Sequence, residues 1–291
     1  MKPAPFGYAD PTSVAEALDV LAAEGDGAKV LAGGQSLIPL LSMRLAAPTA
    51  LVDINRVAGL DRISASPDGV RVGALVRHAH LLASAEAAAV QPLLGRATAN
   101  VAHPAIRNRG TTVGSIAHAD PSGEMTAVLA VTDGSVTVAR PDGSTTVGWR
   151  DLFVGPLETS LHGAAVVVDA FFPALAPRSG TAFAEIARRK GDYAVCGAAV
   201  VVTLDEDRRV AAARAAYLSV GAMPEVHDLT DAVGGKPVDS ADWTAAGELA
   251  RTLVDPDGDL HASADYRRLL VGALTARTLA EAAAEAERRT P

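Results

Sequence analysis

Length, composition and charge set the first limits on this chain. Its 291 residues, 49% of them hydrophobic, exceed the usual size of one domain and favour about two globular domains with buried cores. The formal net charge of −8, without a long lysine or arginine cluster, argues against nucleic-acid binding, because a phosphate backbone demands a basic surface.

Apolar runs and cysteine content narrow the class further. No apolar run approaches the roughly 18 residues of a membrane span, and the N-terminus lacks an apolar signal core, so we expect a cytoplasmic protein without a membrane span. Cys196 is the single cysteine, which excludes an intrachain disulfide and a multi-cysteine zinc or iron–sulfur site. Its apolar run, Tyr193–Val202, predicts a buried strand and an inert thiol.

The N-terminal region predicts a helix followed by a compact strand–helix–strand unit. Asp10-Pro11-Thr12-Ser13 is a helix-start signal for a helix over residues 11–23. Strands are expected over residues 29–32 and 50–54, with a helix over 36–45 between them. One face of that helix carries Leu37, Leu40, Leu41 and Leu45.

A glycine turn, Ala32–Leu37, joins the first strand to this helix. Gly33-Gly34 permits a close backbone approach, and the unpaired amides at a helix start favour an anion such as a pyrophosphate. The alternative is a plain connector, since Gly-Gly turns are common and the chain lacks both Gly-x-Gly-x-x-Gly and Gly-x-x-x-x-Gly-Lys-Ser/Thr near it.

A second subdomain is expected from about residue 57. Its predicted strands cover residues 60–63, 70–75, 134–139, 144–147 and 164–171, and its predicted helices cover 77–100 and 120–131. Ser66–Gly69 and Arg140–Gly143 are hairpin signals. Between the helices, His103–Gly114 predicts a long polar loop rich in donors that leads to another helix start, and Asp120 or Ser122 is expected to cap that helix. The two loops are therefore predicted to form one anion-binding surface.

The C-terminal region predicts an antiparallel sheet and two helices. Pro173–Pro177 is typical of a boundary, and strands are expected over residues 181–188, 198–204 and 210–220. Helices are expected over residues 241–254 and 264–287. The last is predicted to bury Tyr266, Leu269, Leu270, Ala273, Leu274 and Leu279.

Four segments in this order resemble the medium, FAD-binding subunit of the molybdenum hydroxylases, the family of carbon monoxide dehydrogenase and xanthine dehydrogenase. The resemblance covers nearly the whole chain. It is carried by Ala32–Leu37 with the following helix up to Asn55; by Ile106–Thr111 into Gly114 and Ala117–Glu124; by Arg189–Ala194; and by the helix at Asp265–Arg268.

The resemblance implies an α+β fold in two domains. Residues 1–175 would form an FAD-binding domain of the p-cresol methylhydroxylase type, with subdomains of about 1–56 and 57–175. Residues 176–291 would form a C-terminal domain of the CO dehydrogenase flavoprotein type, with an antiparallel sheet and helices.

The resemblance also implies an FAD site. The diphosphate would lie on the first loop, and the second loop would complete the site. Tyr193 and Lys190 would act at the flavin, with Tyr193 near the ring and Lys190 near its electron-rich end. Asp120 would accept a ribitol or ribose hydroxyl, or cap the next helix. The implied cofactor-binding residues are Ala32, Gly33, Gly34, Gln35, Ser36, Leu37, Ile106, Thr111, Gly114, Ser115, His118, Asp120, Lys190, Asp192 and Tyr193.

One position departs from the family pattern. Val113 occupies the place of the first glycine in Thr-Ile/Val-Gly-Gly. If that place requires positive φ, a valine costs about 1–3 kcal/mol, and a Val113→Gly variant would bind FAD better.

The implied function is electron transfer within a complex. A small iron–sulfur subunit and a large molybdenum-cofactor subunit would deliver electrons through FAD to NAD, a quinone or oxygen. The alternatives are a stand-alone FAD-dependent oxidoreductase and a scaffold that has lost flavin. His78, His80, His103 and His118 could be metal ligands, or one of them a covalent flavin tether. No metal site is expected, because His78-Ala79-His80 has no neighbouring carboxylate in sequence.

Overall fold

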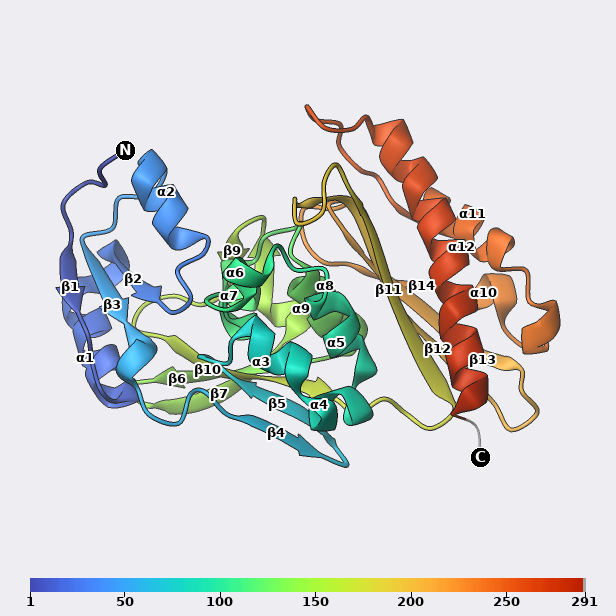
Figure 1. Ribbon diagram of the computed structural model, residues 1–291, viewed down its shortest axis with the longest axis horizontal. Coiled ribbons are helices and arrows are strands. Elements are labelled where there is room, and N and C mark those ends of the chain that lie inside the picture. Colours follow the sequence, from blue (N-terminus) through green and yellow to red (C-terminus); the bar gives the residue numbers. More distant parts are fainter. Residues whose placement is uncertain (290–291) are drawn as a thin grey trace.

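The computed structural model describes residues 1–289 as three groups of elements that follow one another along the long axis of the molecule (Figure 1). The first contains strands β1–β3 with α1 and α2, the second a five-stranded sheet with α3–α9, and the third strands β11–β14 with α10–α12. Mixed helices and antiparallel sheets confirm the predicted α+β class. Within residues 1–289, no helix is long and apolar enough to cross a membrane.

The first group is a small parallel sheet with two helices. Its strand order is β1 (Gly7–Ala9), β3 (Ala50–Asp53), β2 (Ala28–Leu31), and both outer strands pair parallel with β3. The helices are α1 (Val14–Glu24) and α2 (Leu37–Met43). The predicted strand–helix–strand unit is confirmed, while β1 was not predicted.

Helix α2 is shorter and more exposed than the sequence predicted. Arg44 adopts a left-handed conformation (φ 59°) and ends the helix, so Leu45 lies beyond it and is 72% exposed. Leu41 is the one α2 side chain that is fully buried. The apolar face predicted over residues 36–45 therefore reaches the core at a single position.

The second group is an antiparallel sheet covered by short helices. Its strands follow the order β4 (Ile63–Ser66), β5 (Gly69–Gly73), β10 (Val166–Pro173), β6 (Ser135–Arg140), β7 (Gly143–Gly148). Both predicted hairpin turns are present. The helices are α3 (His78–Ala83), α4 (Ala85–Val90), α5 (Pro92–Thr98), α6 (Pro104–Arg107), α7 (Thr112–His118), α8 (Glu124–Val131) and α9 (Trp149–Leu152), and a small hairpin pairs β8 (Phe153–Gly155) with β9 (Glu158–Thr159).

The third group is a four-stranded antiparallel sheet in the order β11 (Ser179–Ala187), β12 (Ala194–Leu204), β13 (Val210–Leu218), β14 (Val226–Asp228). Its helices are α10 (Thr230–Val233), α11 (Trp243–Leu253) and α12 (Ala264–Arg288), and α12 runs across β11 and β12 beside α11 (Figure 1). Because Ala199 and Val201 face one core while Ala198 and Val200 face the other, β12 reads as a continuous apolar run.

The buried face of α12 differs from the predicted one. Tyr266 is 46% exposed, Leu269 is 53% exposed and Ala273 is exposed, whereas Leu270, Leu274 and Leu279 are buried as predicted. The sheet and α11 cover a face that also includes Val271, Thr275 and Thr278. Leucine and alanine spacing alone predicts the wrong face, because the position of α11 decides which side of α12 is covered.

A partly buried ion pair links the second and third groups. Arg96 of α5 donates to both carboxylate oxygens of Glu285 on α12, at 2.5 and 2.7 Å. Glu285 also accepts the Thr181 amide of β11 at 2.8 Å, and Arg96 donates to the Thr181 hydroxyl at 2.6 Å. One helix, one strand and one distant helix are therefore joined at a single point.

Candidate functional site

The first glycine loop leaves β2 and enters α2 with several donors unused. Gly34 has φ of 72°, which favours glycine, and the Gln35 side-chain amide donates to the Gly33 carbonyl at 3.0 Å. Within the described part of the chain, no acceptor engages the backbone amides of residues 33–36. These amides precede the start of α2, where Leu37 is half-buried, and are therefore free to donate to an anion.

The second loop lies directly against the first. A Cβ atom added to Gly33 would lie 2.6 Å from the Arg109 carbonyl oxygen and 2.7 Å from Gly110 Cα. Only a glycine at position 33 permits this backbone approach. The structure thus brings together two segments about eighty residues apart in sequence, as one continuous surface.

The stretch predicted as a long loop, residues 103–114, instead contains α6 and the start of α7. The Ile106 carbonyl accepts the Gly110 amide at 2.7 Å, which closes the turn between the helices. Thr111 caps α7, since its hydroxyl accepts the Gly114 amide at 3.1 Å, and Thr111 itself is buried. The buried Thr111 hydroxyl therefore fixes the backbone where the loop enters α7.

Val113 adopts helical backbone in the first turn of α7 and is 2% exposed. The premise that its position needs positive φ is therefore wrong: the backbone here is helical, so valine carries no left-handed strain. Its side chain packs in the main core instead.

A Val113→Gly variant should consequently lose stability rather than gain flavin affinity. Removing a buried valine and placing glycine in a helix is expected to cost about 2–4 kcal/mol. Chemical denaturation of parent and variant measures this, with FAD titration alongside. An unchanged unfolding midpoint, or tighter FAD binding, would contradict the helical assignment of Val113.

Asp120 closes a turn between α7 and α8 and does not cap α8. Its Oδ1 accepts the Ser122 amide at 2.8 Å, whereas Gly123 occupies the N-cap position of α8 without a side-chain bond. The expected Asp120 or Ser122 cap is therefore corrected. The second carboxylate oxygen lies 4.0 Å from His118 Nε2. Ser115, on the preceding helix, and His118 are both half-buried beside this turn.

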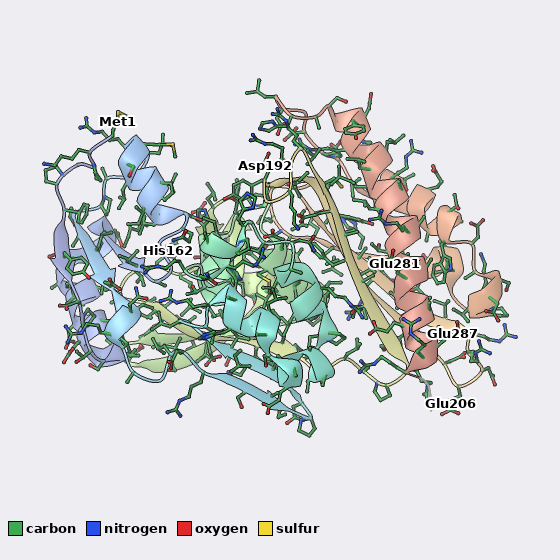
Figure 2. All side chains as sticks on the ribbon, viewed as in Figure 1. Met1, His162, Asp192, Glu206, Glu281 and Glu287 are labelled. Carbon is green, nitrogen blue, oxygen red and sulfur yellow. The ribbon has the colours of Figure 1, made fainter. Side chains whose placement is uncertain are left out.

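The turn between β11 and β12 brings Tyr193 to both loops. Although Tyr193 is 65% exposed, its side chain lies close to Ser36 of the first loop and to Asp120 in the turn between α7 and α8. Partial desolvation and the neighbouring carboxylates raise its pKa above the usual value, so it remains a neutral phenol. Asp192 in the same turn receives the Arg189 Nε–H at 3.0 Å, and Figure 2 shows it at the opposite end of β12 from Glu206.

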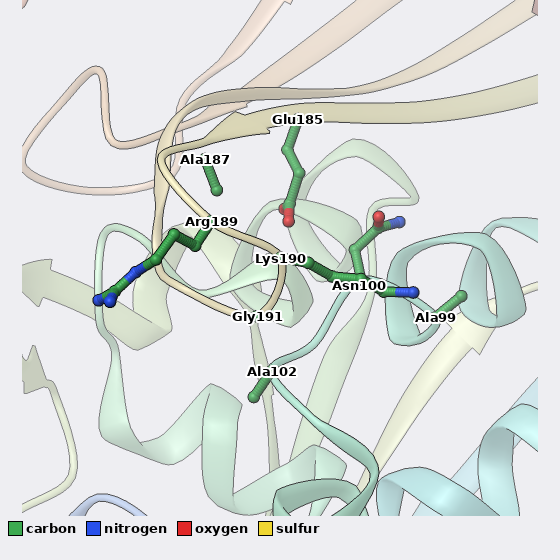
Figure 3. Close-up of a pocket in the computed structure, with 8 residues that line it drawn as sticks. All are labelled: Ala99, Asn100, Ala102, Glu185, Ala187, Arg189, Lys190 and Gly191. Carbon is green, nitrogen blue, oxygen red and sulfur yellow. The ribbon is translucent and has the colours of Figure 1, made fainter.

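Lys190 lies on another side of this turn. It lines a pocket of about 190 Å³ with Asn100 and Glu185, and Figure 3 shows Lys190 and Arg189 pointing in different directions. The turn packs against His103, the residue that precedes α6, because a Cβ atom added to Gly191 would lie 2.4 Å from the His103 ring. The structure therefore places Tyr193, but not the Lys190 side chain, against the two glycine loops.

Two carboxyl groups near this turn were not singled out from sequence. Burial raises the pKa of Glu185 to about 8, with a further contribution from Glu124, and burial raises the pKa of Glu124 to about 7. Glu185 Oε2 is buried without a hydrogen-bond partner. Glu185 is the one charged residue in the apolar run of β11, and only the structure shows that its Oε2 is covered.

The raised pKa of Glu185 predicts a pH-dependent stability. Between its ordinary pKa near 4.5 and about 8, the folded chain binds more protons than the unfolded chain, so the free energy of unfolding falls as pH rises through this range. Glu185→Gln should flatten that fall and melt above the parent near pH 8. Thermal melting at several pH values measures this, with the exposed Glu281→Gln as control. Parallel pH profiles for parent and Glu185→Gln would contradict the assignment.

A larger cavity of about 500 Å³ lies on the C-terminal side of Tyr193. Asp120 and Ser122 border it from the turn between α7 and α8, His261 borders it from the loop before α12, and Arg267 borders it from the start of α12. Tyr193 therefore stands between the glycine loops and an open pocket.

The histidines do not form a metal centre in the described residues. No group of three or more histidine, cysteine or acidic side chains converges within residues 1–289. His78 is 4% exposed, and burial lowers its pKa to about 4, so it is a neutral core residue that contacts the Thr112 hydroxyl at 3.3 Å. Cys196 is fully buried, and burial raises the pKa of its thiol to about 12.

Two known protein families match successive parts of this chain. Residues 4–175 match the FAD binding domain in molybdopterin dehydrogenase, and residues 181–282 match the CO dehydrogenase flavoprotein C-terminal domain. The 6-hydroxypseudooxynicotine dehydrogenase complex subunit alpha of Paenarthrobacter nicotinovorans is 41% identical over 97% of this chain and 96% of its own. The carbon monoxide dehydrogenase medium chain of Hydrogenophaga pseudoflava is 34% identical over 96% and 97%.

Solved structures show the same fold. Quinoline 2-oxidoreductase from Pseudomonas putida 86 superposes with a TM-score of 0.91 at 38% identity, covering 98% of this chain and 99% of the other. Carbon monoxide dehydrogenase from Hydrogenophaga pseudoflava gives the same TM-score at 34% identity, with the same coverage. The chain therefore belongs to the FAD-binding medium subunits of the molybdenum hydroxylase family and is an FAD-dependent oxidoreductase subunit.

Proposed function

We propose that FAD is held between the two glycine loops and that this chain passes electrons through it inside a molybdenum hydroxylase complex. The observation that carries the placement is the backbone contact at Gly33, which makes a single donor-rich surface from two distant segments. In a chain of net charge −8, amides at helix starts are a suitable partner for a diphosphate.

The residues of the site take distinct roles in this proposal. Amides of residues 33–36 would donate to the diphosphate, and the Asp120 carboxylate would accept a hydrogen bond from a hydroxyl of the ribityl or ribose group. Tyr193, close to Ser36 and Asp120, would lie beside the flavin ring. Lys190 and Asp192 would support the turn that presents Tyr193. Bound FAD supplies the redox chemistry, and the protein binds it, orients it and tunes its surroundings.

A division at about residue 175 completes the proposal. Residues 1–175 would act as the FAD-binding domain, and residues 176–291 would form the C-terminal domain that supplies Tyr193. Two hydrophobic cores, one on each face of β12, support this division. The ion pair of Arg96 and Glu285 then joins the two domains.

The partners follow from the redox chemistry and from the relatives. A complex subunit and two medium chains are among the similar proteins, and the single buried Cys196 leaves this chain without ligands for an iron–sulfur cluster. A small iron–sulfur subunit and a large molybdenum-cofactor subunit would therefore supply the electrons. The acceptor would be NAD, a quinone or oxygen.

Isolation of the native complex through a tag on this chain tests the proposal. We expect two co-purifying subunits, with flavin, iron and molybdenum in the same particle and a flavin spectrum that bleaches on addition of the substrate of the complex. A flavin-loaded chain that purifies alone and oxidises a small molecule directly would support the stand-alone enzyme instead. A chain that carries no flavin and takes up none when FAD is added would support the third alternative, a scaffold that has lost flavin.

A further inference from the structure

A chain of hydrogen bonds holds the two glycine loops at a fixed spacing. It starts at Asn55, which follows β3 and donates through Nδ2 to the Ala32 carbonyl of the first loop at 2.8 Å. The same side chain, with its own backbone amide, donates to Asp53 Oδ1 at 2.6 and 2.9 Å. Tyr8 of β1 donates to the other oxygen of Asp53 at 2.8 Å. Asn55 is therefore oriented by the Ala32 carbonyl and by an Asp53 carboxylate that Tyr8 holds in place.

Arg77 carries this connection to the second loop. Its Nη2 donates to Asn55 Oδ1 at 2.6 Å, and its Nη1 donates to the Arg109 carbonyl at 2.6 Å. The Arg109 carbonyl is also the atom that lies nearest to the Cβ position of Gly33. One planar guanidinium thus spans from a residue bonded to the first loop to the backbone of the second, which a lysine ammonium cannot reproduce.

The charge of Arg77 is left largely uncompensated by these bonds. Both of its acceptors are neutral oxygens. The carboxylate that acts on it, Asp53, is already engaged by Asn55 and Tyr8. Arg109 adds a second cation close by, since its charge acts on Arg77, and its side chain is exposed. Positive charge therefore gathers where the loops meet, in a chain whose net charge is −8.

We propose that Asn55 and Arg77 form a clamp that sets the distance between the two FAD loops and supplies fixed positive charge to the diphosphate. Neither residue needs to touch FAD, so both are positioning residues. A diphosphate bridging both loops requires their amides in place at the same time, and preorganised donors bind more tightly than donors that must first be ordered. The inference rests on the proposed placement of FAD between the loops.

FAD titration of the full chain after removal of bound flavin tests the clamp. Arg77→Gln should weaken FAD binding by about 10–100-fold, the range for lost hydrogen bonds to a charged group. Arg77→Lys keeps the charge but loses the span, so it should weaken binding while retaining the salt dependence of the parent. Arg77→Gln should show a shallower salt dependence, which a purely structural defect would not produce.

A double-mutant cycle isolates the connection itself. Asn55→Ala should weaken binding as well, and Asn55→Ala with Arg77→Gln should lose little more than the worse single variant, because the bond between Asn55 and Arg77 makes both residues links of the same connection between the loops. Arg71→Gln, which breaks an ion pair with Asp169 on the central sheet, is the matched control and should bind FAD like the parent.

The outcomes separate the clamp from the site it serves. A parent chain that does not bind FAD would overturn the proposed function. A parent that binds FAD, with folded Arg77→Gln and Asn55→Ala variants of equal affinity, would overturn the clamp alone. If Arg77→Gln does not fold, the FAD titrations of Arg77→Lys and Asn55→Ala test the clamp instead. FAD affinity equal to that of the parent in both variants would overturn it.

Discussion

A Gly33→Ala variant should lose FAD binding by at least about a hundredfold while keeping the fold of its C-terminal sheet. The added methyl carbon would lie 2.6 Å from the Arg109 carbonyl oxygen, 2.7 Å from Gly110 Cα and 3.0 Å from the Thr111 amide. All three are backbone atoms, which cannot rotate away as a flexible side chain can. The loops must separate, and donors displaced by about 1 Å lose most of their binding contribution.

Titration with FAD, followed by visible absorbance, measures this effect. Gly95→Ala is the matched control, because a Cβ atom at that α5 position has nothing within 4 Å. It should leave FAD affinity unchanged and favour the helix slightly. Parental FAD affinity in Gly33→Ala would show that the contact between the loops does not build the flavin site.

Replacing Glu285 by alanine should destabilise the chain by about 2–4 kcal/mol, because the buried Thr181 amide loses its acceptor and the partly buried Arg96 loses its carboxylate partner. Arg96 would lose both of its 2.5 and 2.7 Å contacts, and the buried Thr181 amide would lose its acceptor at 2.8 Å. The Glu285 side chain is only 11% exposed, so water cannot readily replace these bonds.

Denaturant unfolding followed by circular dichroism measures the loss. Glu281→Ala on the same helix is the matched control, since that residue pairs with Arg277 at 3.9 Å with both side chains more than half exposed. Its effect should stay within about 0.5 kcal/mol. Equal unfolding midpoints for the two variants would show that the partly buried pair does not join α5, β11 and α12.

The sequence predicted the elements of this fold well where local chemistry decides them. The hairpins at Ser66–Gly69 and Arg140–Gly143 and the parallel unit around the first glycine turn all follow from turn residues and short apolar runs. Helix faces were less predictable. The exposure of Leu45 and Leu269 depends on where a helix ends and on which neighbours cover it, and neither is written in the spacing of leucines.

The two loops of the candidate site could be predicted from the sequence, but their contact could not. Glycines and hydrogen-bond donors identify each loop, whereas the approach of Gly33 to Gly110 depends on the tertiary structure. Val113 shows the limit of a motif comparison, because a position occupied by glycine elsewhere proved to be ordinary helix. Arg77 carried no motif at all, and only its bonds to Asn55 and the Arg109 carbonyl reveal it.

In the proposed site the two glycine loops together hold the diphosphate of FAD. Parallel titration of the flavin-free full chain with FAD and with riboflavin tests this placement most directly, because riboflavin carries the same ring and ribityl chain without the diphosphate and adenosine. Saturable binding of one FAD per chain, with riboflavin at least about a hundredfold weaker, is the predicted result. Equal affinity for the two flavins, or no binding of FAD by the folded chain, would contradict it.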